Sequence, residues 1–323
     1  MNGEVEGFIQ DAYETLKSGD ENSALGFLKE ALRVDFEHEE LLYALKCLNW
    51  WLEKLRRLDD FYGPFERGEY ILSQWEPYNA FLAIIGNAYD SCQYALKCFV
   101  FSRALNYYLE LLSDGTNQQD PALLLQIGRC YKGAGEWEEA LRYIKQASGL
   151  KREDSAILSE LADINALFGE TRIAKMLFRE AFYLDPQGVD LAGLESEMIR
   201  KLVDKIRDLG YSGNELAEWI PVWGCIWGIF SVKRELKPVE LGRLKQSILS
   251  LENEYRSKSG RASADLSDDK SRIKPRLLNR YFWLIDYCEQ NRDTTGLIDK
   301  GLIDETMLKI KFIDPLVHEH YKT

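Results

Sequence analysis

The sequence predicts an all-α protein built largely from antiparallel pairs of helices. Two observations carry this prediction. First, apolar residues recur at spacings of three and four in most segments of the 323-residue chain, which is typical of amphipathic helices. Second, residues 121–186 repeat one pattern at a distance of 34 residues, so that Gly135 matches Gly169. Both glycines fall between periodic stretches, and Pro186 follows the last one, where a helix must end.

The residues that recur are those that two closely packed helices require. Gly128 and its counterpart Ala162 lie midway along the first helix of each unit, and Ala140 and Ala174 lie early in the second. A larger side chain at these contacts would push the helix axes apart. The space between the helices is filled by larger apolar side chains at matched positions: Leu124, Ile127, Tyr131 and Ile144, then Leu158, Leu161 and Phe178.

This period, with small residues at the helix contacts, resembles the tetratricopeptide repeat (TPR) family. The resemblance implies a right-handed α-solenoid of antiparallel helix pairs that holds another protein. Clear repeats cover 5–38, 121–154 and 155–188, and degenerate repeats cover 39–84 and 85–120. The solenoid is therefore predicted over 1–188. Beyond the repeats, the layout is only generally similar to that of uncharacterised bacterial TPR-domain proteins of this length.

The degenerate repeats predict the least regular helices. Residues 39–61 indicate one long helix, and Gly68 resembles the turn that leads into a second helix over 70–85. Pro77 should kink or split that second helix. In the next unit, Phe99 stands where the turn glycine belongs.

The resemblance also indicates which side chains face the concave groove. Together with the neighbouring Gln126, the residues chosen as a partner-binding surface are Tyr13, Leu16, Leu125, Arg129, Lys132, Ser159 and Asp163. The best-known TPR groove clamps a terminal carboxylate with Lys and Asn, but Tyr13, Arg129 and Asp163 stand where that Asn is needed. Arg129 and Lys132, assisted by Gln126, are instead predicted to form a cationic spot. The alternative is that both are solvated charges.

Residues 189–323 predict a helical C-terminal domain. An amphipathic helix over 189–209, ended by Gly210, suits the exposed end of a solenoid. Helices are also expected over 238–258 and 277–289, on either side of a polar linker at 259–271. The segment 308–312 alternates apolar and polar residues, so both a short strand and a helical end remain open there.

The most apolar stretch of the chain, residues 217–232, is expected to be a helix with Pro221 in its first turn. Trp219, Trp223 and Trp227 are spaced by four and therefore form one stripe. The stripe is a candidate interface for a partner or a second subunit, because Trp is enriched at binding hot spots. The alternative is that it belongs to the core. The stretch is shorter than the roughly 20 residues that span a bilayer, although it suits a shallow surface anchor.

The net charge limits the classes of partner that we expect, and the cysteines indicate the cellular compartment. A net charge of −12 disfavours nucleic acid and anionic membranes as partners. The six cysteines form no Cys-x-x-Cys pair, so we interpret them as reduced thiols of a cytoplasmic protein. The first ten residues contain two acids and no base, which predicts an amphipathic helix and not a signal peptide. No apolar run is long enough for a transmembrane segment.

The sequence contains no motif that places a nucleophile, a phosphate loop or a zinc site. His318 and His320 would point the same way on a strand but diverge on a helix, so no metal site or cofactor is predicted. The leading hypothesis is a non-enzymatic scaffold that binds a protein or peptide. One alternative is a structural protein that self-associates as a homo-oligomer through the Trp stripe. A third hypothesis is an enzyme with an unrecognised site in the last third of the chain.

Overall fold

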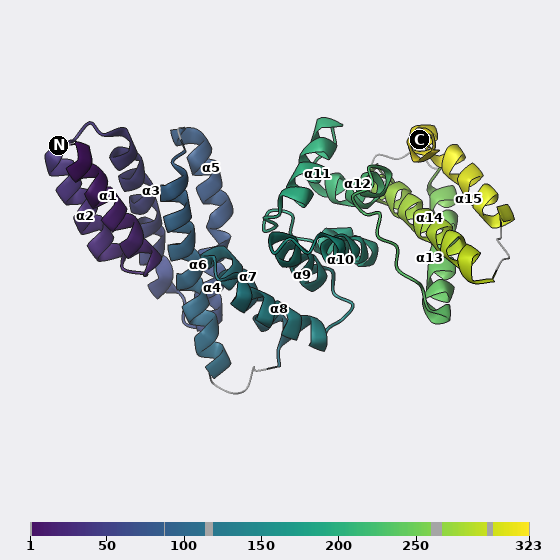
Figure 1. The fold of residues 1–323 in the computed structure, drawn as a ribbon, viewed down its shortest axis with the longest axis horizontal. Helices are drawn as coiled ribbons and strands as arrows, with labels where there is room; N and C mark the ends of the chain where they lie inside the picture. The colour runs from purple at the N-terminus through teal and green to yellow at the C-terminus, as the bar shows by residue number, and fades with distance from the viewer. Residues whose placement is uncertain (1, 87, 114–118, 260–266, 296–299, 323) are drawn as a thin grey trace. The chain divides into compact units, whose positions relative to one another are not determined.

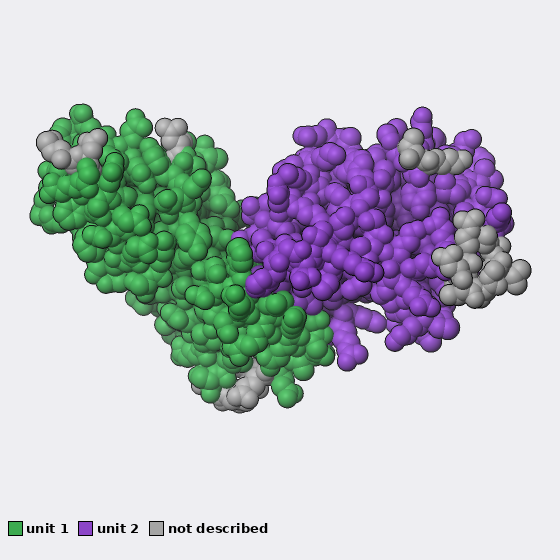
Figure 2. All heavy atoms as spheres, in the orientation of Figure 1, with its two compact units in different colours: residues 1–150 green, residues 151–323 purple. Residues whose placement is uncertain are grey.

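A computed structural model describes residues 2–86, 88–113, 119–259, 267–295 and 300–322. These residues form helices joined by turns and loops, with no strand among them, which confirms the all-α prediction (Figure 1). The chain divides into two compact units, residues 1–150 (unit 1) and 151–323 (unit 2), coloured separately in Figure 2. None of the helices that the structure describes is at once long enough and apolar enough to cross a membrane.

Unit 1 begins with the helix pair that the first repeat predicts. Helix α1 (Asn2–Lys17) and helix α2 (Glu21–Val34) are joined by Gly19, whose φ of 89° is left-handed. The side chain of Asp20 then caps α2 by accepting a hydrogen bond from the Ser23 N–H at 3.0 Å. The contact residues of this pair are fully buried alanines, namely Ala12, Ala24 and Ala31.

The middle of unit 1 differs from the predicted repeats. Helix α3 (Glu39–Leu55) continues into a 3₁₀ helix, η1 (Arg56–Asp60). Helix α4 (Pro64–Ser73) and helix α5 (Trp75–Ile85) follow. The helix predicted over 70–85 is thus split just before Pro77, which is one of the two effects expected of that proline.

Two predicted turns in this region are wrong. Gly68 is a buried residue inside α4, where a Cβ atom would lie 2.7 Å from the Tyr108 ring. Its role is close packing and not a turn. Phe99 is fully buried within α6 (Asp90–Ser113), a single 24-residue helix. Because its large side chain fills the core, the helix continues through the position where a repeat would turn.

The last pair of unit 1 lies within residues 121–150. Helix α7 (Pro121–Ala134) is capped by Asp120 and ends at Gly135, whose φ is 86°. Helix α8 (Trp137–Leu150) packs against α7. A Cβ atom on Gly128 would lie 2.5 Å from Ile144 Cγ1, so glycine sets how closely these two helices approach.

Unit 2 begins with a second pair of the same design. Helix α9 (Ser155–Leu167) and helix α10 (Thr171–Leu184) are joined through Gly169, whose φ is 80°. A 3₁₀ helix, η2 (Pro186–Gly188), follows. Buried residues of α9 and α10 belong to the same hydrophobic core as the helices after them. The boundary between the compact units therefore follows Leu150, whereas the sequence predicted a solenoid that extends to residue 188.

Two helices of unit 2 begin at different residues from those expected. Helix α11 (Glu197–Asp208) starts eight residues later than predicted, because the chain turns over residues 190–193. Helix α12 (Gly213–Ile226) starts earlier, which places Pro221 inside the helix and not in its first turn.

The remaining helices complete the core of unit 2. They are α13 (Pro238–Ser259), α14 (Ser267–Thr295), α15 (Lys300–Ile313) and α16 (Pro315–Lys322). Residues 308–312 lie within α15, so the helical alternative holds there and the strand does not. Of the predicted linker 259–271, residues 260–266 lie outside the described residues. Its two ends are helical and not linker, because Ser259 is the last residue of α13 and residues 267–271 belong to α14.

Candidate functional site

The predicted groove residues of α1 lie in the core of unit 1. Tyr13 is 2% exposed and Leu16 is 1% exposed. The Tyr13 hydroxyl donates a hydrogen bond to Glu40 of α3 at 3.0 Å. Helix α6 packs against α1, so a helix of the same unit covers the face that was expected to meet a partner.

The predicted groove residues of α7 are more varied. Leu125 and Lys132 are buried, whereas Gln126 and Arg129 are half-buried. Gln126 donates a hydrogen bond to Glu69 of α4 at 3.1 Å, and the same carboxylate oxygen accepts one from Tyr108. Arg129 is therefore the more accessible of the two cations that the sequence placed in the groove.

The predicted groove residues of α9 stabilise unit 2 itself. Asp163 is fully buried, and its two carboxylate oxygens accept hydrogen bonds from the N–H groups of Glu195 and Ser196, each at 2.8 Å. These donors stand at the start of α11, where a helix leaves N–H groups without partners in its own backbone. Ser159 is fully buried as well, and its hydroxyl donates to the Ala156 carbonyl.

The Trp stripe lies mostly within the core of unit 2. Trp219 and Trp223 are 4% and 3% exposed and pack in that core, as the second interpretation of the stripe expects. Trp227 is half-buried and stacks on Trp223 with the ring centroids 5.2 Å apart. The ammonium group of Lys205 lies 4.8 Å from the centre of the Trp227 ring. Of the three residues, Trp227 offers the most accessible surface.

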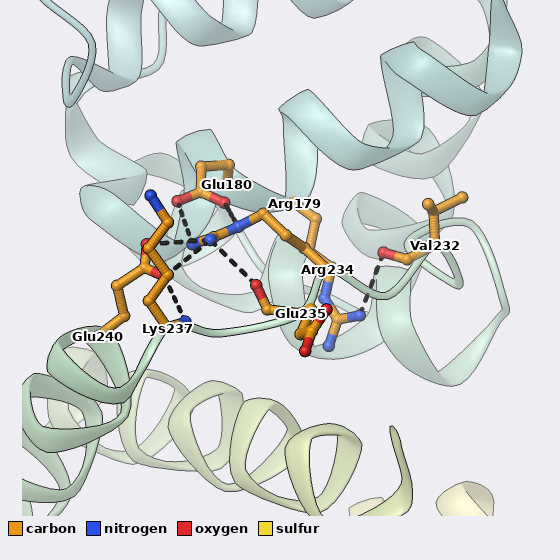
Figure 3. A network of polar contacts seen from close by, with 7 residues as sticks. All are labelled: Arg179, Glu180, Val232, Arg234, Glu235, Lys237 and Glu240. Atoms are coloured by element: carbon orange, nitrogen blue, oxygen red, sulfur yellow. Dashed lines mark hydrogen bonds and ion pairs between the residues drawn. The ribbon is translucent and has the colours of Figure 1, made fainter. Parts of the chain in front are cut away.

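A polar network that the sequence did not predict holds the segment between α12 and α13 (Figure 3). Arg234 in this segment pairs with Glu180 of α10 and with Glu240 of α13, both at 2.9 Å. The Lys237 N–H donates to Glu240 at 2.7 Å, and Arg179 of α10 donates to the Val232 carbonyl at 3.4 Å (Figure 3). The network thus ties an extended segment to the helices on either side of it.

The same network continues to α14 through a buried cation. Arg179 is 3% exposed, forms an ion pair with Asp286, and has its guanidinium 4.7 Å from the centre of the Trp283 ring. Burial lowers the pKa of Arg179, but the nearby Cys225 and Asp286 raise it by more, so its charge is retained. Lys233 pairs with the same Asp286 at 2.8 Å. Lys233 also pairs with Glu289, so two cations face two anions in this network, which indicates a structural role.

Unit 1 holds a cluster of thiols and phenols around Gln93. Cys47 of α3 and Cys92 of α6 are both buried in the core of unit 1, and Cys92 directly precedes Gln93 in the chain. The Gln93 amide donates to the Tyr43 hydroxyl at 2.7 Å and approaches the Cys47 sulfur at 3.8 Å, while Tyr78 donates to Gln93 at 3.1 Å. The sequence predicted only scattered thiols here, because the cluster brings together residues of α3 and α6 that lie more than 40 positions apart, such as Cys47 and Gln93.

Two surface pockets accompany these clusters. In unit 1, a pocket of about 180 Å³ is lined by Glu39, Leu42, Tyr43, Lys46, Ile85 and Tyr89. In unit 2, a pocket of about 250 Å³ lies along α11 between apolar side chains and the cations Arg200 and Arg207. Within the described part of the chain, no group of three or more His, Cys, Asp or Glu side chains is arranged to hold a metal ion. His318 and His320 both lie on the helix α16.

Comparison with known proteins adds no assignment, since no protein-family model and no curated protein sequence matches the chain.

Proposed function

We propose that the chain is a non-enzymatic scaffold that binds another protein, with TPR-like helix pairs stacked as a right-handed solenoid. The observation that carries the proposal is the shared design of α7–α8 and α9–α10. Each first helix ends at a left-handed glycine, Gly135 or Gly169, with φ of 86° and 80°. In each second helix, equivalent alanines are fully buried, at Ala140 and Ala147 and at Ala174 and Ala181.

A design that recurs at a fixed period favours binding over catalysis. Stacked helix pairs present the same helix faces side by side, and solenoids use the resulting extended surfaces to hold other chains. The net charge of −12 favours a partner segment that is basic or apolar. We propose a protein or peptide partner in the cytoplasm.

The surfaces proposed for the partner are those around Arg129 on α7 and Trp227 after α12. Arg129 is the half-buried cation of the predicted groove, and Trp227 is the half-buried residue of the Trp stripe. Tyr13, Leu16 and Asp163 serve the fold through contacts within their own units. We therefore do not include these three residues in the proposed partner-binding surface.

Affinity capture from cells that express the protein, with the full-length chain as bait, tests this proposal. A specific partner should be retained by the wild type and lost with Arg129→Glu or with Trp227→Ala, which assigns the surface. Arg33→Glu is the matched control for the charge reversal, because Arg33 is exposed and pairs only locally with Glu30. Circular dichroism should show unchanged helix content in each variant.

Two results would contradict the proposal. If both variants retain the partner as well as the wild type does, neither surface binds it. If the wild type retains no specific protein, the scaffold function itself is contradicted. Lys132→Glu is not a suitable variant, because a buried cation replaced by an anion would also disturb the fold.

A structural protein that self-associates is the second candidate function. The observation in its favour is that α6 packs against α1 where an open groove was expected, so the chain supplies its own occupant there. Light scattering over a range of concentrations tests it. A mass equal to one chain at every concentration would contradict self-association, whereas a concentration-dependent increase in mass would support it.

A further inference from the structure

We propose that the pocket along α11 in unit 2 binds a small carboxylic acid that carries an apolar tail. This site is separate from the surfaces proposed for a protein partner, since neither Arg129 nor Trp227 lines the pocket. Two features of the pocket point to such a ligand. Its floor is apolar, and its lining includes the exposed cation Arg200, which forms no ion pair within the described part of the chain.

The pocket lies between α11 and the segment that precedes this helix, residues 191–194. On α11, Arg200, Val203 and Arg207 are spaced by three and four residues, so they share one face of the helix and line the same pocket. The volume of about 250 Å³ is slightly below the roughly 300–1,000 Å³ of pockets that hold drug-sized ligands. The pocket is therefore suited to a small molecule.

Both walls of the pocket are held by contacts within unit 2. Asp163 accepts hydrogen bonds from the N–H groups of Glu195 and Ser196, each at 2.8 Å, and so fixes the start of α11. On the opposite wall, the Gly193 N–H donates to the Asp190 carbonyl at 3.2 Å, which closes the turn there. The pocket is thus formed before a ligand arrives, and a preformed site reduces the ordering cost of binding.

The floor of the pocket is apolar. Leu194, Ile199 and Val203 line the pocket, are almost fully buried and belong to the hydrophobic core of unit 2. An apolar tail that lies on this floor is removed from water, which is the main favourable contribution to the binding of apolar groups. A carboxylate without such a tail should therefore bind more weakly.

Arg200 supplies the donors for the carboxylate of the ligand. Its Nε donates to the Leu194 carbonyl at 3.1 Å, which holds the guanidinium beside the pocket and leaves the N–H groups on its Nη atoms for another acceptor. Asp204, the anion of the lining, pairs with Arg207 at 3.1 Å and not with Arg200. A carboxylate can accept two parallel hydrogen bonds from a guanidinium group, so we expect it to bind here.

The charges of the lining favour a ligand with a single negative charge. Two cations, Arg200 and Arg207, and one anion, Asp204, leave one positive charge in excess. A carboxylate carries one negative charge, whereas a phosphate monoester carries about −1.5 to −2 at pH 7. The second charge of a phosphate would lie near Asp204 without a cation to compensate it, so the carboxylate is the better match.

The test is an NMR titration of the full-length protein, labelled at its Ile, Leu and Val methyl groups, with sodium hexanoate. The methyl signals of Ile199 and Val203 should shift and reach saturation. Hexanamide has the same tail but no charge, so it should bind about tenfold more weakly, because hydrogen bonds to charged groups are the stronger ones. Acetate should also bind more weakly than hexanoate, because it lacks the tail.

Three variants assign the binding to this pocket. Arg200→Gln should weaken the binding of hexanoate about tenfold and change that of hexanamide much less. Asp204→Asn should tighten the binding of hexanoate, because it removes the anion that competes for Arg207. Lys201→Gln is the matched control and should bind as the wild type does. Lys201 is exposed, lies next to Arg200 in the chain, pairs with Glu197 and does not line the pocket.

Several results would overturn the proposal. One is the absence of a saturable shift at Ile199 and Val203, and another is binding of hexanamide as tight as that of hexanoate. A third is an equal loss of affinity in Lys201→Gln and Arg200→Gln. Damage to the fold cannot produce the gain expected of Asp204→Asn, so an unchanged or lower affinity of that variant for hexanoate would overturn the proposal as well.

Discussion

Arg276 of α14 forms two hydrogen bonds to the carboxylate of Glu218 of α12, at 2.8 Å from Nε and 2.6 Å from Nη2. Glu218 is fully buried, and Arg276 is its ion-pair partner. Gln187 donates a further hydrogen bond to Glu218 at 2.9 Å, and Arg276 also contacts Asp185. The group thus joins three segments of unit 2 at one buried charge.

Replacing Arg276 with methionine should destabilise unit 2 by about 3–5 kcal/mol, because it leaves the Glu218 carboxylate buried without its cation. The measurement is urea unfolding of the full chain, followed by a signal from the tryptophans of unit 2. The double variant Arg276→Met with Glu218→Gln should recover part of this loss, since no charge then remains buried.

The matched control is Lys201→Met in the same unit. Lys201 pairs with Glu197 at the surface, where both side chains are more than 70% exposed. Exposed pairs contribute little, so this change should alter the free energy of unfolding by no more than about 0.5 kcal/mol. Equal effects of Arg276→Met and Lys201→Met would contradict the structural role of the buried pair.

Gly128→Ala should destabilise unit 1 by about 1–3 kcal/mol, because the added methyl group overpacks the contact between α7 and α8. The new Cβ would lie 2.5 Å from Ile144 Cγ1 and 3.3 Å from the Ala140 carbonyl oxygen. Ile144 is fully buried and has little room to move. The clash should outweigh the gain of about 1 kcal/mol in helix propensity. Thermal or urea unfolding measures the difference.

Gly26→Ala provides the comparison for this prediction. Gly26 is an exposed residue inside α2, and a Cβ there would meet no atom within 4 Å. The change should therefore stabilise unit 1 by about 0.5–1 kcal/mol. If Gly128→Ala stabilises the protein as Gly26→Ala does, the close approach of α7 and α8 is not a constraint on the fold.

The helices that the sequence predicted well are those whose ends are fixed by local signals. Helices α7 and α9 begin at the capping residues Asp120 and Asp154, and each is followed by a left-handed glycine, Gly135 or Gly169, so their ends are encoded within a few residues. Helices α4 to α6 are different, because their ends depend on packing between residues that are far apart in sequence. The Tyr108 ring of α6 can pack so closely on α4 because residue 68 is a glycine, and a single-sequence pattern carries no signal for that contact.

The predicted groove residues show the same difference between local signals, which the sequence carries, and long-range contacts, which it does not. The repeat register placed Tyr13 and Asp163 on particular faces of their helices, but it could not show what covers those faces. Tyr13 is covered because α6 packs on α1, and Asp163 is engaged because its carboxylate caps a helix that begins more than 30 residues later. The contacts of Gln93 with Tyr43 and Cys47 and the ion pairs of Arg234 are likewise long-range.

Gly169→Ala should destabilise unit 2 by about 1–2 kcal/mol through the backbone alone. Its φ of 80° is left-handed, and no neighbouring atom would lie within 4 Å of a new Cβ. Gly169→Asn should cost less, because asparagine tolerates this conformation better. Urea unfolding of unit 2 gives the comparison.

Gly242→Ala is the control in the same unit, since Gly242 lies within α13 and has equally open surroundings. This change should stabilise the unit by up to about 1 kcal/mol. A loss of stability equal to that of Gly169→Ala would show that the φ angle is not the cause.

Asp154→Ala should cost unit 2 about 0.5–2 kcal/mol at neutral pH through loss of a helix cap. The Asp154 carboxylate accepts a hydrogen bond from the Ile157 N–H at 3.0 Å at the start of α9 and pairs with Lys151 at 2.7 Å. Asp154→Asn should cost less, because its amide oxygen can still accept the capping hydrogen bond. Equal losses in the two variants would indicate that the carboxylate charge, and not the cap, is responsible.

The stabilisation by Asp154 should depend on pH in one direction. Burial raises the pKa of Asp154, but the hydrogen bonds from Lys151 and the Ile157 N–H lower it by more, so that the pKa in the folded chain lies below its ordinary value of 3.8. A carboxyl group with a lowered pKa contributes its full stabilisation above the pKa of the unfolded chain and loses it as the pH falls through the folded value. The difference in unfolding free energy between wild type and Asp154→Asn should thus be constant from pH 7 to about pH 5 and should shrink below pH 3.8. A difference that grows as the pH falls would mean that Asp154 is held in its protonated form, and the pairing with Lys151 would then not stabilise α9.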